Sequence, residues 1–91
     1  MVRAVRDNPS DNRFELEVND ELAVAYYSRS PGIITFTHTE VPPALSGQGI
    51  GSRLARGALE LVRIEGLKVV AKCPFISAFI AKHPEFNNLL L

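Results

Sequence analysis

The feature that most constrains this chain is a change in the spacing of its apolar residues near the midpoint. Residues 33–41 are rich in β-branched and aromatic side chains, which favours a strand, and two prolines end it because proline cannot donate to a β-ladder. Over residues 49–65 the apolar positions recur at helical spacing, with charged residues on the opposite face. Residues 67–73 return to a short apolar run, which indicates a strand. This order predicts a βαβ unit with two parallel strands.

The remaining segments extend this unit at both ends. A short first strand is expected around Val2 and Ala4, and the alternation over residues 14–18 and 22–28 predicts a hairpin. After the βαβ unit, Pro74 suits the first residue of a helix and Pro84 its end, and the tail is expected to form a helical turn. The order β-β-β-β-α-β-α gives an α/β (α+β) fold class: a mixed, mostly antiparallel sheet with a βαβ unit and two to three helices.

Length and charge exclude several classes of protein. A chain of 91 residues has room for one hydrophobic core, so residues 1–91 are predicted to be a single domain. Ten basic residues balance ten acidic ones, which argues against a nucleic-acid or anionic-membrane binder. The balance is −3 over residues 1–45 and +3 over residues 46–91, so an anion is expected on the second half, although chance also produces such splits. The single cysteine allows no internal disulfide and no multi-cysteine metal site, which favours a cytoplasmic protein.

The strongest binding feature is a glycine-rich turn between the predicted strand 33–41 and the predicted helix. It reads Ser46-Gly47-Gln48-Gly49-Ile50-Gly51-Ser52. Glycines allow a tight turn with bare N–H groups, and the first turn of a helix adds more of them and the positive end of its dipole. Such a turn suits phosphate. The spacing matches neither a dinucleotide fingerprint nor a P-loop, which needs a lysine here. The alternative is a tight connection that binds nothing.

This turn resembles the acetyl-coenzyme A signature of the GNAT N-acetyltransferase superfamily. Gly49 and Gly51 match its two small positions, whereas Ser46 stands where the signature has Arg or Gln. Nearly the whole chain resembles the small, single-domain branch of that superfamily. The segments that carry this resemblance are Asp7-Asn8-Pro9, Arg13-Phe14-Glu15, His38-Thr39-Glu40-Val41-Pro42-Pro43-Ala44-Leu45, Gly49-Ile50-Gly51, Cys73-Pro74-Phe75 and His83-Pro84-Glu85.

The resemblance implies where coenzyme A would bind. It would lie in a gap between the parallel strands 33–41 and 67–73, with the first strand's end pairing with the pantetheine arm and the turn taking the pyrophosphate. The residues implied to bind the coenzyme are Val41, Ser46, Gly47, Gln48, Gly49, Ile50, Gly51 and Ser52. Larger members carry further helices and strands that contribute to the acceptor site. This chain has no room for them, so its acceptor site must be open or completed by a partner.

Three residues are candidates for the chemistry. Strict alternation puts His38 on the face of Ile34 and Phe36, near the end of its strand, where ligands bind in open α/β sheets. Histidine can remove a proton near neutral pH; the alternative is a histidine bonded to a neighbour. Glu40, on the same predicted face, is a second base or a solvated charge. Cys73 precedes a helix whose dipole favours a thiolate, so it could carry the acetyl group, or it is a buried core residue.

Further roles follow from the resemblance and remain alternatives. It implies that His38 and Cys73 flank the thioester. Tyr26 and Tyr27 could supply the phenol that often protonates the leaving thiolate in this superfamily, but their position in an early strand argues against it. The cations at the end of the last helix, Lys82 and His83, suit its dipole as caps and could also approach the coenzyme's phosphates.

The sequence therefore predicts an acetyl-CoA-dependent N-acetyltransferase whose acceptor is an amine of a small molecule or a protein lysine. No metal, nucleic acid or membrane is expected, and a monomer and a homodimer are both compatible. The amine would attack directly, with His38 or Glu40 taking its proton and a backbone N–H near Val41 polarising the carbonyl. An acetylated Cys73 is the variant route. The alternatives are a coenzyme A or acyl-CoA binding module without catalysis, and an interaction domain whose turn is only structural.

Overall fold

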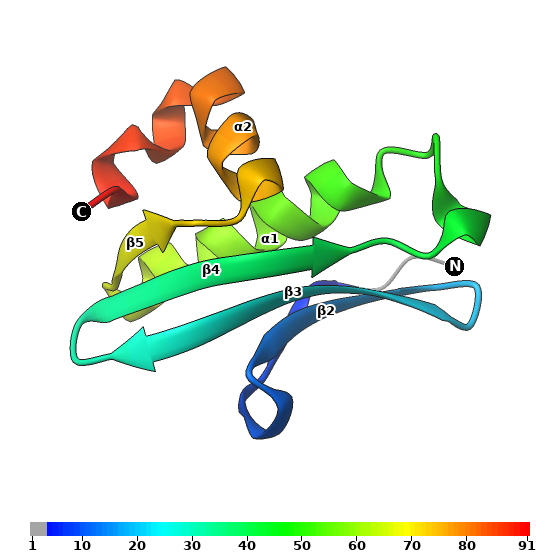
Figure 1. The fold of residues 1–91 in the computed structure, drawn as a ribbon, viewed down its shortest axis with the longest axis horizontal. Coiled ribbons are helices and arrows are strands. Elements are labelled where there is room, and N and C mark those ends of the chain that lie inside the picture. The colour runs from blue at the N-terminus through cyan, green and yellow to red at the C-terminus, as the bar shows by residue number, and fades with distance from the viewer. Residues whose placement is uncertain (1–3) are drawn as a thin grey trace.

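The computed structural model describes residues 4–91, which form a five-stranded sheet with two helices over one face (Figure 1). The strands are β1 (Arg6–Asn8), β2 (Arg13–Val18), β3 (Glu21–Ser30), β4 (Ile33–Glu40) and β5 (Lys68–Ala71), and they lie in this order across the sheet. The helices are α1 (Ile50–Glu65) and α2 (Pro74–Lys82), with 3₁₀ turns at Pro9–Asp11, Pro43–Leu45 and Pro84–Leu89. Neighbouring strands are antiparallel except β4 and β5, which are parallel.

The predicted fold class and element order are confirmed, with differences in the bounds of two strands. Helix α1 ends at Gly66 as expected, where the Gly66 N–H donates to the Arg63 carbonyl at 3.0 Å. The last strand is shorter than predicted because the chain leaves the sheet after Ala71. The first strand begins at Arg6 rather than around Val2 and Ala4. The turn that joins β1 to β2 sets the register of β1. Ala4 lies before this strand, and Val2 is outside the described residues.

One hydrophobic core fills the space between the sheet and its helices. Its aromatic centre is formed by Phe14, Tyr27 and Phe36 from three strands, with ring centroids 5.2 and 5.8 Å apart around Phe14. Helix α1 buries one face against it, and this face consists of Ile50, Leu54, Ala55, Ala58, Leu59 and Val62. The helical spacing in the sequence therefore corresponds to the side of α1 that covers the sheet.

An irregularity in the pairing of β3 with β4 changes which face the end of β4 presents. Tyr26 pairs with His38 and Tyr27 pairs with Phe36, so Thr37 is an extra residue on β4. Such a bulge shifts the alternation of side chains by one position. His38 therefore shares a face with Tyr26, which is the face that no helix covers, and not with the buried Phe36.

The predicted placement of His38 and Glu40 beside Ile34 and Phe36 is thus wrong. Thr39 takes that face instead, because it pairs with Ala25 of the core. The bulge depends on how two strands pair and leaves no mark in the apolar alternation of either one.

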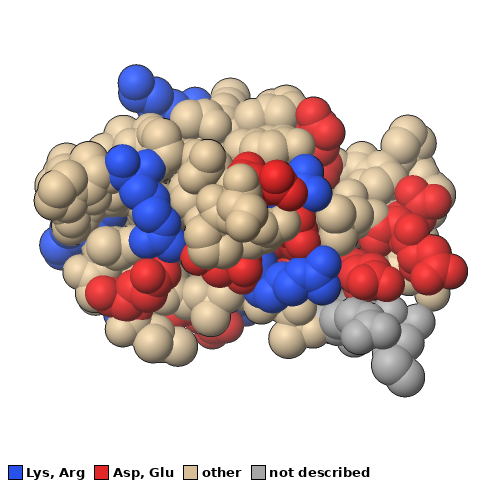
Figure 2. Space-filling model, turned by 90° about the horizontal axis from the view of Figure 1, so that it is seen from below, with Lys and Arg blue, Asp and Glu red and all other residues tan. Residues whose placement is uncertain are grey.

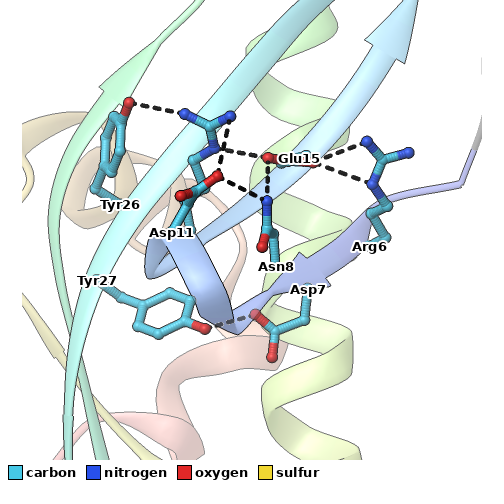
Figure 3. Close-up of polar contacts among 8 residues, drawn as sticks. Arg6, Asp7, Asn8, Asp11, Glu15, Tyr26 and Tyr27 are labelled. Carbon is cyan, nitrogen blue, oxygen red and sulfur yellow. Dashed lines mark hydrogen bonds and ion pairs between the residues drawn. The ribbon is translucent and has the colours of Figure 1, made fainter.

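A charged network around Glu15 covers the face of the sheet opposite the helices (Figure 3). The Glu15 side chain is only 3% exposed. Arg6 donates to one carboxylate oxygen from Nε and Nη2 at 3.0 and 2.8 Å; Arg13 Nε and Asn8 Nδ2 donate to the other at 2.6 and 2.9 Å. Burial alone would raise the pKa of Glu15, but the hydrogen bonds from Asn8, Arg13 and Arg6 outweigh it and lower that pKa. Because Arg13 also donates to the Tyr26 hydroxyl at 3.1 Å, the network extends toward His38.

The lowered pKa of Glu15 predicts how stability depends on pH. The ionised Glu15 carboxylate contributes fully to the free energy of unfolding above the ordinary carboxyl pKa of 4.5. This contribution is lost as the pH falls through the lower pKa that Glu15 has in the folded protein. We expect Glu15→Gln to lower the free energy of unfolding at pH 7 by about 2 kcal/mol and to flatten its decline in acid. Urea unfolding from pH 3 to pH 7 measures both effects, with the exposed Glu60→Gln as control. Equal losses in the two variants would contradict the role of the network.

Candidate functional site

Strands β4 and β5 separate part of the way along their length. Their pairing runs only as far as Phe36 and Ala71. Beyond this point the N–H groups of Lys72 and Cys73 both donate to the Phe36 carbonyl, at 3.1 and 2.9 Å. Strand β4 continues to Glu40 while β5 turns away toward α2 (Figure 1). Among the described residues, the edge of β4 beyond Phe36 therefore has no strand partner on this side, and an extended ligand could pair with it.

A hollow of about 270 Å³ lies where the glycine-rich turn meets the start of α2. Its lining residues are Val41, Leu45, Ser46, Gly47, Gly49, Ile50, Gly51, Ser52 and Phe75. These include every residue predicted to bind a coenzyme except Gln48, whose side-chain amide donates to the Ala44 carbonyl at 3.4 Å. Leu45 and Phe75 were not predicted, since neither belongs to the glycine pattern. Their binding role, like that of the predicted residues, stays a prediction.

The first turn of α1 leaves backbone N–H groups available at this hollow. Gly49 precedes the helix in a left-handed conformation, with φ of 71°, and as the N-cap residue it has no side chain with which to cap the helix. The Arg53 N–H reaches back to the Gly49 carbonyl at 3.1 Å. Within the described chain, the N–H groups of Ile50, Gly51 and Ser52 make no such backbone bond. Together with the helix dipole they form a site suited to an anion.

Gly51 is needed for a different reason, which is the close approach of an aromatic ring. A Cβ atom at this position would lie 2.7 Å from Phe75 Cζ, inside van der Waals contact. The bare Gly51 backbone therefore lets Phe75 lie across the start of α1 and form one wall of the hollow.

This contact predicts that Gly51→Ala lowers the free energy of unfolding by about 1 kcal/mol, the lower end of the cost of overpacking, because Phe75 is partly exposed and can move. Phe75→Leu should remove most of that penalty. Chemical unfolding of both single variants and the double variant measures the coupling, and Ser52→Ala is the control. A penalty of the same size with and without Phe75 would contradict the contact.

Cys73 lies at the separation of the strands, on the helix side of the sheet. Its side chain is 3% exposed and belongs to the core, and its Sγ is 3.2 Å from Thr39 Oγ1. The bulge at Thr37 explains this contact because it turns Thr39 toward the helices. Cys73 also precedes Pro74, the first residue of α2, as expected.

His38 and Glu40 lie together on the open face. His38 Nε2 is 3.0 Å from Glu40 Oε2, and both side chains are well exposed, at 60% and 61%. The His38 ring stacks on Tyr26, with centroids 6.2 Å apart. Tyr26 thus approaches the candidate base despite its early position in the sequence, because β3 pairs along β4. A second hollow, of about 440 Å³, adjoins this pair and is lined by Leu22, Thr39, Glu40, Val41, Pro42 and Pro43.

Tyr27 lies away from these groups. It points to the other side of β3 from Tyr26, and its hydroxyl donates to Asp7 Oδ1 at 2.6 Å (Figure 3). Burial and this hydrogen bond raise the pKa of Tyr27. Arg29 stacks over its ring and pairs with Asp7 and Glu65, which ties the end of α1 to the sheet. Tyr27 therefore has a structural role at this position.

Figure 2 shows a group of acidic side chains at the right of the face seen, while over the rest of this face acidic and basic side chains lie next to one another. Among residues 4–91, no group of three or more His, Cys, Asp and Glu side chains could hold a metal ion. No helix in this part of the chain is both long and apolar enough to cross a membrane.

Comparison with known proteins gives a consistent match over most of the chain. Residues 13–89 match the family model described as GCN5-related N-acetyl-transferase. The protein NATD1 of Homo sapiens is 35% identical over 66 residues, which cover 72% of this chain and 58% of that protein. NATD1 of Danio rerio is 29% identical over 92 residues, covering 96% and 84%. The solution structure of a GCN5-like protein from Staphylococcus aureus superposes with a TM-score of 0.72 at 28% identity, covering 96% of this chain and 86% of that one.

Proposed function

This chain belongs to the GCN5-related N-acetyltransferase family, and on that premise we propose that it transfers an acetyl group from acetyl-CoA to an amine. The observation that carries the proposal is the separation of β4 and β5 beyond Phe36. On the helix side of this separation lie the glycine-turn hollow and Cys73, and on the open face lie His38 and Glu40. A thioester between the strands would therefore be within reach of an amine that arrives from the open face.

The residues around the first hollow fit coenzyme A. The free N–H groups of Ile50, Gly51 and Ser52 would donate to the pyrophosphate, and the glycines leave the backbone bare where it approaches. The partnerless edge of β4 and Val41 would pair with the amides of the pantetheine arm. When bound, acetyl-CoA supplies the acetyl group as a thioester, which is open to attack by an amine. A backbone N–H near Val41 would hold the carbonyl oxygen.

His38 is the proposed base. Most amines are protonated at neutral pH and must lose a proton before they can attack a carbonyl carbon. Glu40, 3.0 Å from Nε2, would accept a hydrogen bond from that nitrogen and leave Nδ1 to take the proton.

Cys73 is buried on the other face, beside Thr39, where His38 cannot activate its thiol directly. We therefore favour direct attack by the amine over an acetylated Cys73.

The two routes predict opposite results for two variants. For direct attack, His38→Gln should lower kcat/KM by about 100-fold or more, because it removes the base, whereas Cys73→Ala should keep most of the activity. Release of free coenzyme A, measured with a panel of polyamines, amino acids and lysine peptides, gives these values. Circular dichroism checks that both variants fold. An inactive Cys73→Ala with an active His38→Gln would move the chemistry to an acetyl-cysteine intermediate.

Intact mass spectrometry tests the proposed function itself. Under native conditions we expect a mass increase of one acetyl-CoA after incubation with acetyl-CoA, and with a suitable amine we expect an acetylated product and free coenzyme A. Binding without transfer to any amine in the panel would instead identify a coenzyme-binding module. Failure to bind coenzyme A in calorimetry would overturn both functions.

A further inference from the structure

A smaller hollow of about 90 Å³ adjoins the glycine-turn hollow on its α2 side. Its lining residues are Ser52, Phe75, Ala78, Phe79, Lys82 and His83. Ser52 and Phe75 line both hollows, so the two form one surface that runs from the glycine-rich turn along α2. The chemistry proposed above uses only the first part of that surface.

Lys82 brings a free positive charge to the smaller hollow. Among the Lys and Arg residues in the described part of the chain, only Arg53, Lys72 and Lys82 have a side chain that makes no hydrogen bond or ion pair. Arg53 lines a different hollow, beside Val5 and Gly57, and Lys72 follows β5. Lys82 is therefore the unpaired cation available to a ligand at this place.

The walls of the smaller hollow are aromatic. Phe75 is 41% exposed, and the His83 ring stacks on Phe79 with centroids 4.0 Å apart. His83 Nδ1 is held by the Phe79 carbonyl at 2.8 Å, which leaves Nε2 for a ligand. Flat apolar surfaces beside a cation suit a ligand that combines a planar base with a phosphate group.

We propose that the 3′-phosphorylated nucleotide end of coenzyme A lies across the smaller hollow, with Lys82 as the cation that contacts the 3′-phosphate. This inference rests on the proposed function. Coenzyme A carries a pyrophosphate within its chain and a separate phosphate monoester on its ribose. If the pyrophosphate lies at the first turn of α1, the surface past Ser52 and Phe75 leads the nucleotide to Lys82. The protein would then distinguish coenzyme A from 3′-dephospho-coenzyme A, although both carry the same pyrophosphate and pantetheine.

Calorimetry with these two compounds tests the proposal. The protein should bind coenzyme A about tenfold more tightly than 3′-dephospho-coenzyme A, as expected for one charge-assisted contact. Lys82→Met keeps the apolar stem of an exposed side chain and should bring that ratio close to one, with unchanged affinity for the dephospho compound. Lys72→Met removes another unpaired lysine and should leave the ratio as it is. Added salt should shrink the preference only when Lys82 is present.

Three outcomes would overturn the proposal. The first is equal affinity of the unaltered protein for the two compounds, and the second is a preference that survives Lys82→Met. The third is a preference that Lys72→Met abolishes and Lys82→Met does not. In each of these cases coenzyme A still binds, so the proposed function stands. If neither compound binds, the proposed function fails and this inference fails with it.

Discussion

The carbonyl of Phe36 accepts the N–H groups of two successive residues, and the arrangement of the site depends on this shared acceptor. It ends the parallel pairing, because the chain of β5 turns away there toward α2. Strand β4 nevertheless continues straight, since β3 pairs with it as far as Glu40. Within residues 4–91, the result is a strand edge that is fixed on one side and without a strand partner on the other. Such an edge can bind an extended ligand with little loss of conformational entropy, because its own backbone is already ordered.

A single extra residue in β4 divides the neighbouring side chains between the two faces of the sheet. Without the bulge at Thr37, strict alternation would turn His38 toward the core and Thr39 toward solvent. With it, Thr39 contacts the buried thiol of Cys73, and His38 joins Tyr26 and Glu40 on the open face. In the proposed reaction, the amine would therefore approach His38 from the open face, whereas the coenzyme would bind at the glycine turn on the helix side. The bulge therefore has the position expected of a functional irregularity.

The sequence predicted well those elements that depend on local spacing. The helical period of α1 and its end at Gly66 follow from local spacing, and the crossover to a parallel strand follows from the order of consecutive elements; the structure has all three. It predicted poorly what depends on pairing between distant residues. The bulge requires β3 and β4 together, and the network of Glu15 requires β1 to lie beside β2. In sequence, Glu15 is one of two alternating glutamates and gives no sign of burial, so only the cross-strand contacts with Arg6 and Asn8 distinguish it.

Although the net charge is zero, a few cationic side chains of the described residues are not held by an acidic or polar partner. Arginine side chains are mostly committed to fixed pairs, as in the contacts of Arg29 with Glu65 and of Arg56 with Glu85. The planar guanidinium suits such pairs, because it can meet a carboxylate with two hydrogen bonds at once. Among residues 4–91, the side chains of Lys72 and Lys82 have no hydrogen-bond or ion-pair partner, and both belong to the second half of the chain, where the sequence has its basic excess. A free lysine near a helix N-terminus, as Lys82 is near Ser52 of α1, can attract a small anion locally, whereas a polymeric anion would need a broad basic surface. Neutrality and the binding of one anionic coenzyme are therefore compatible in this fold.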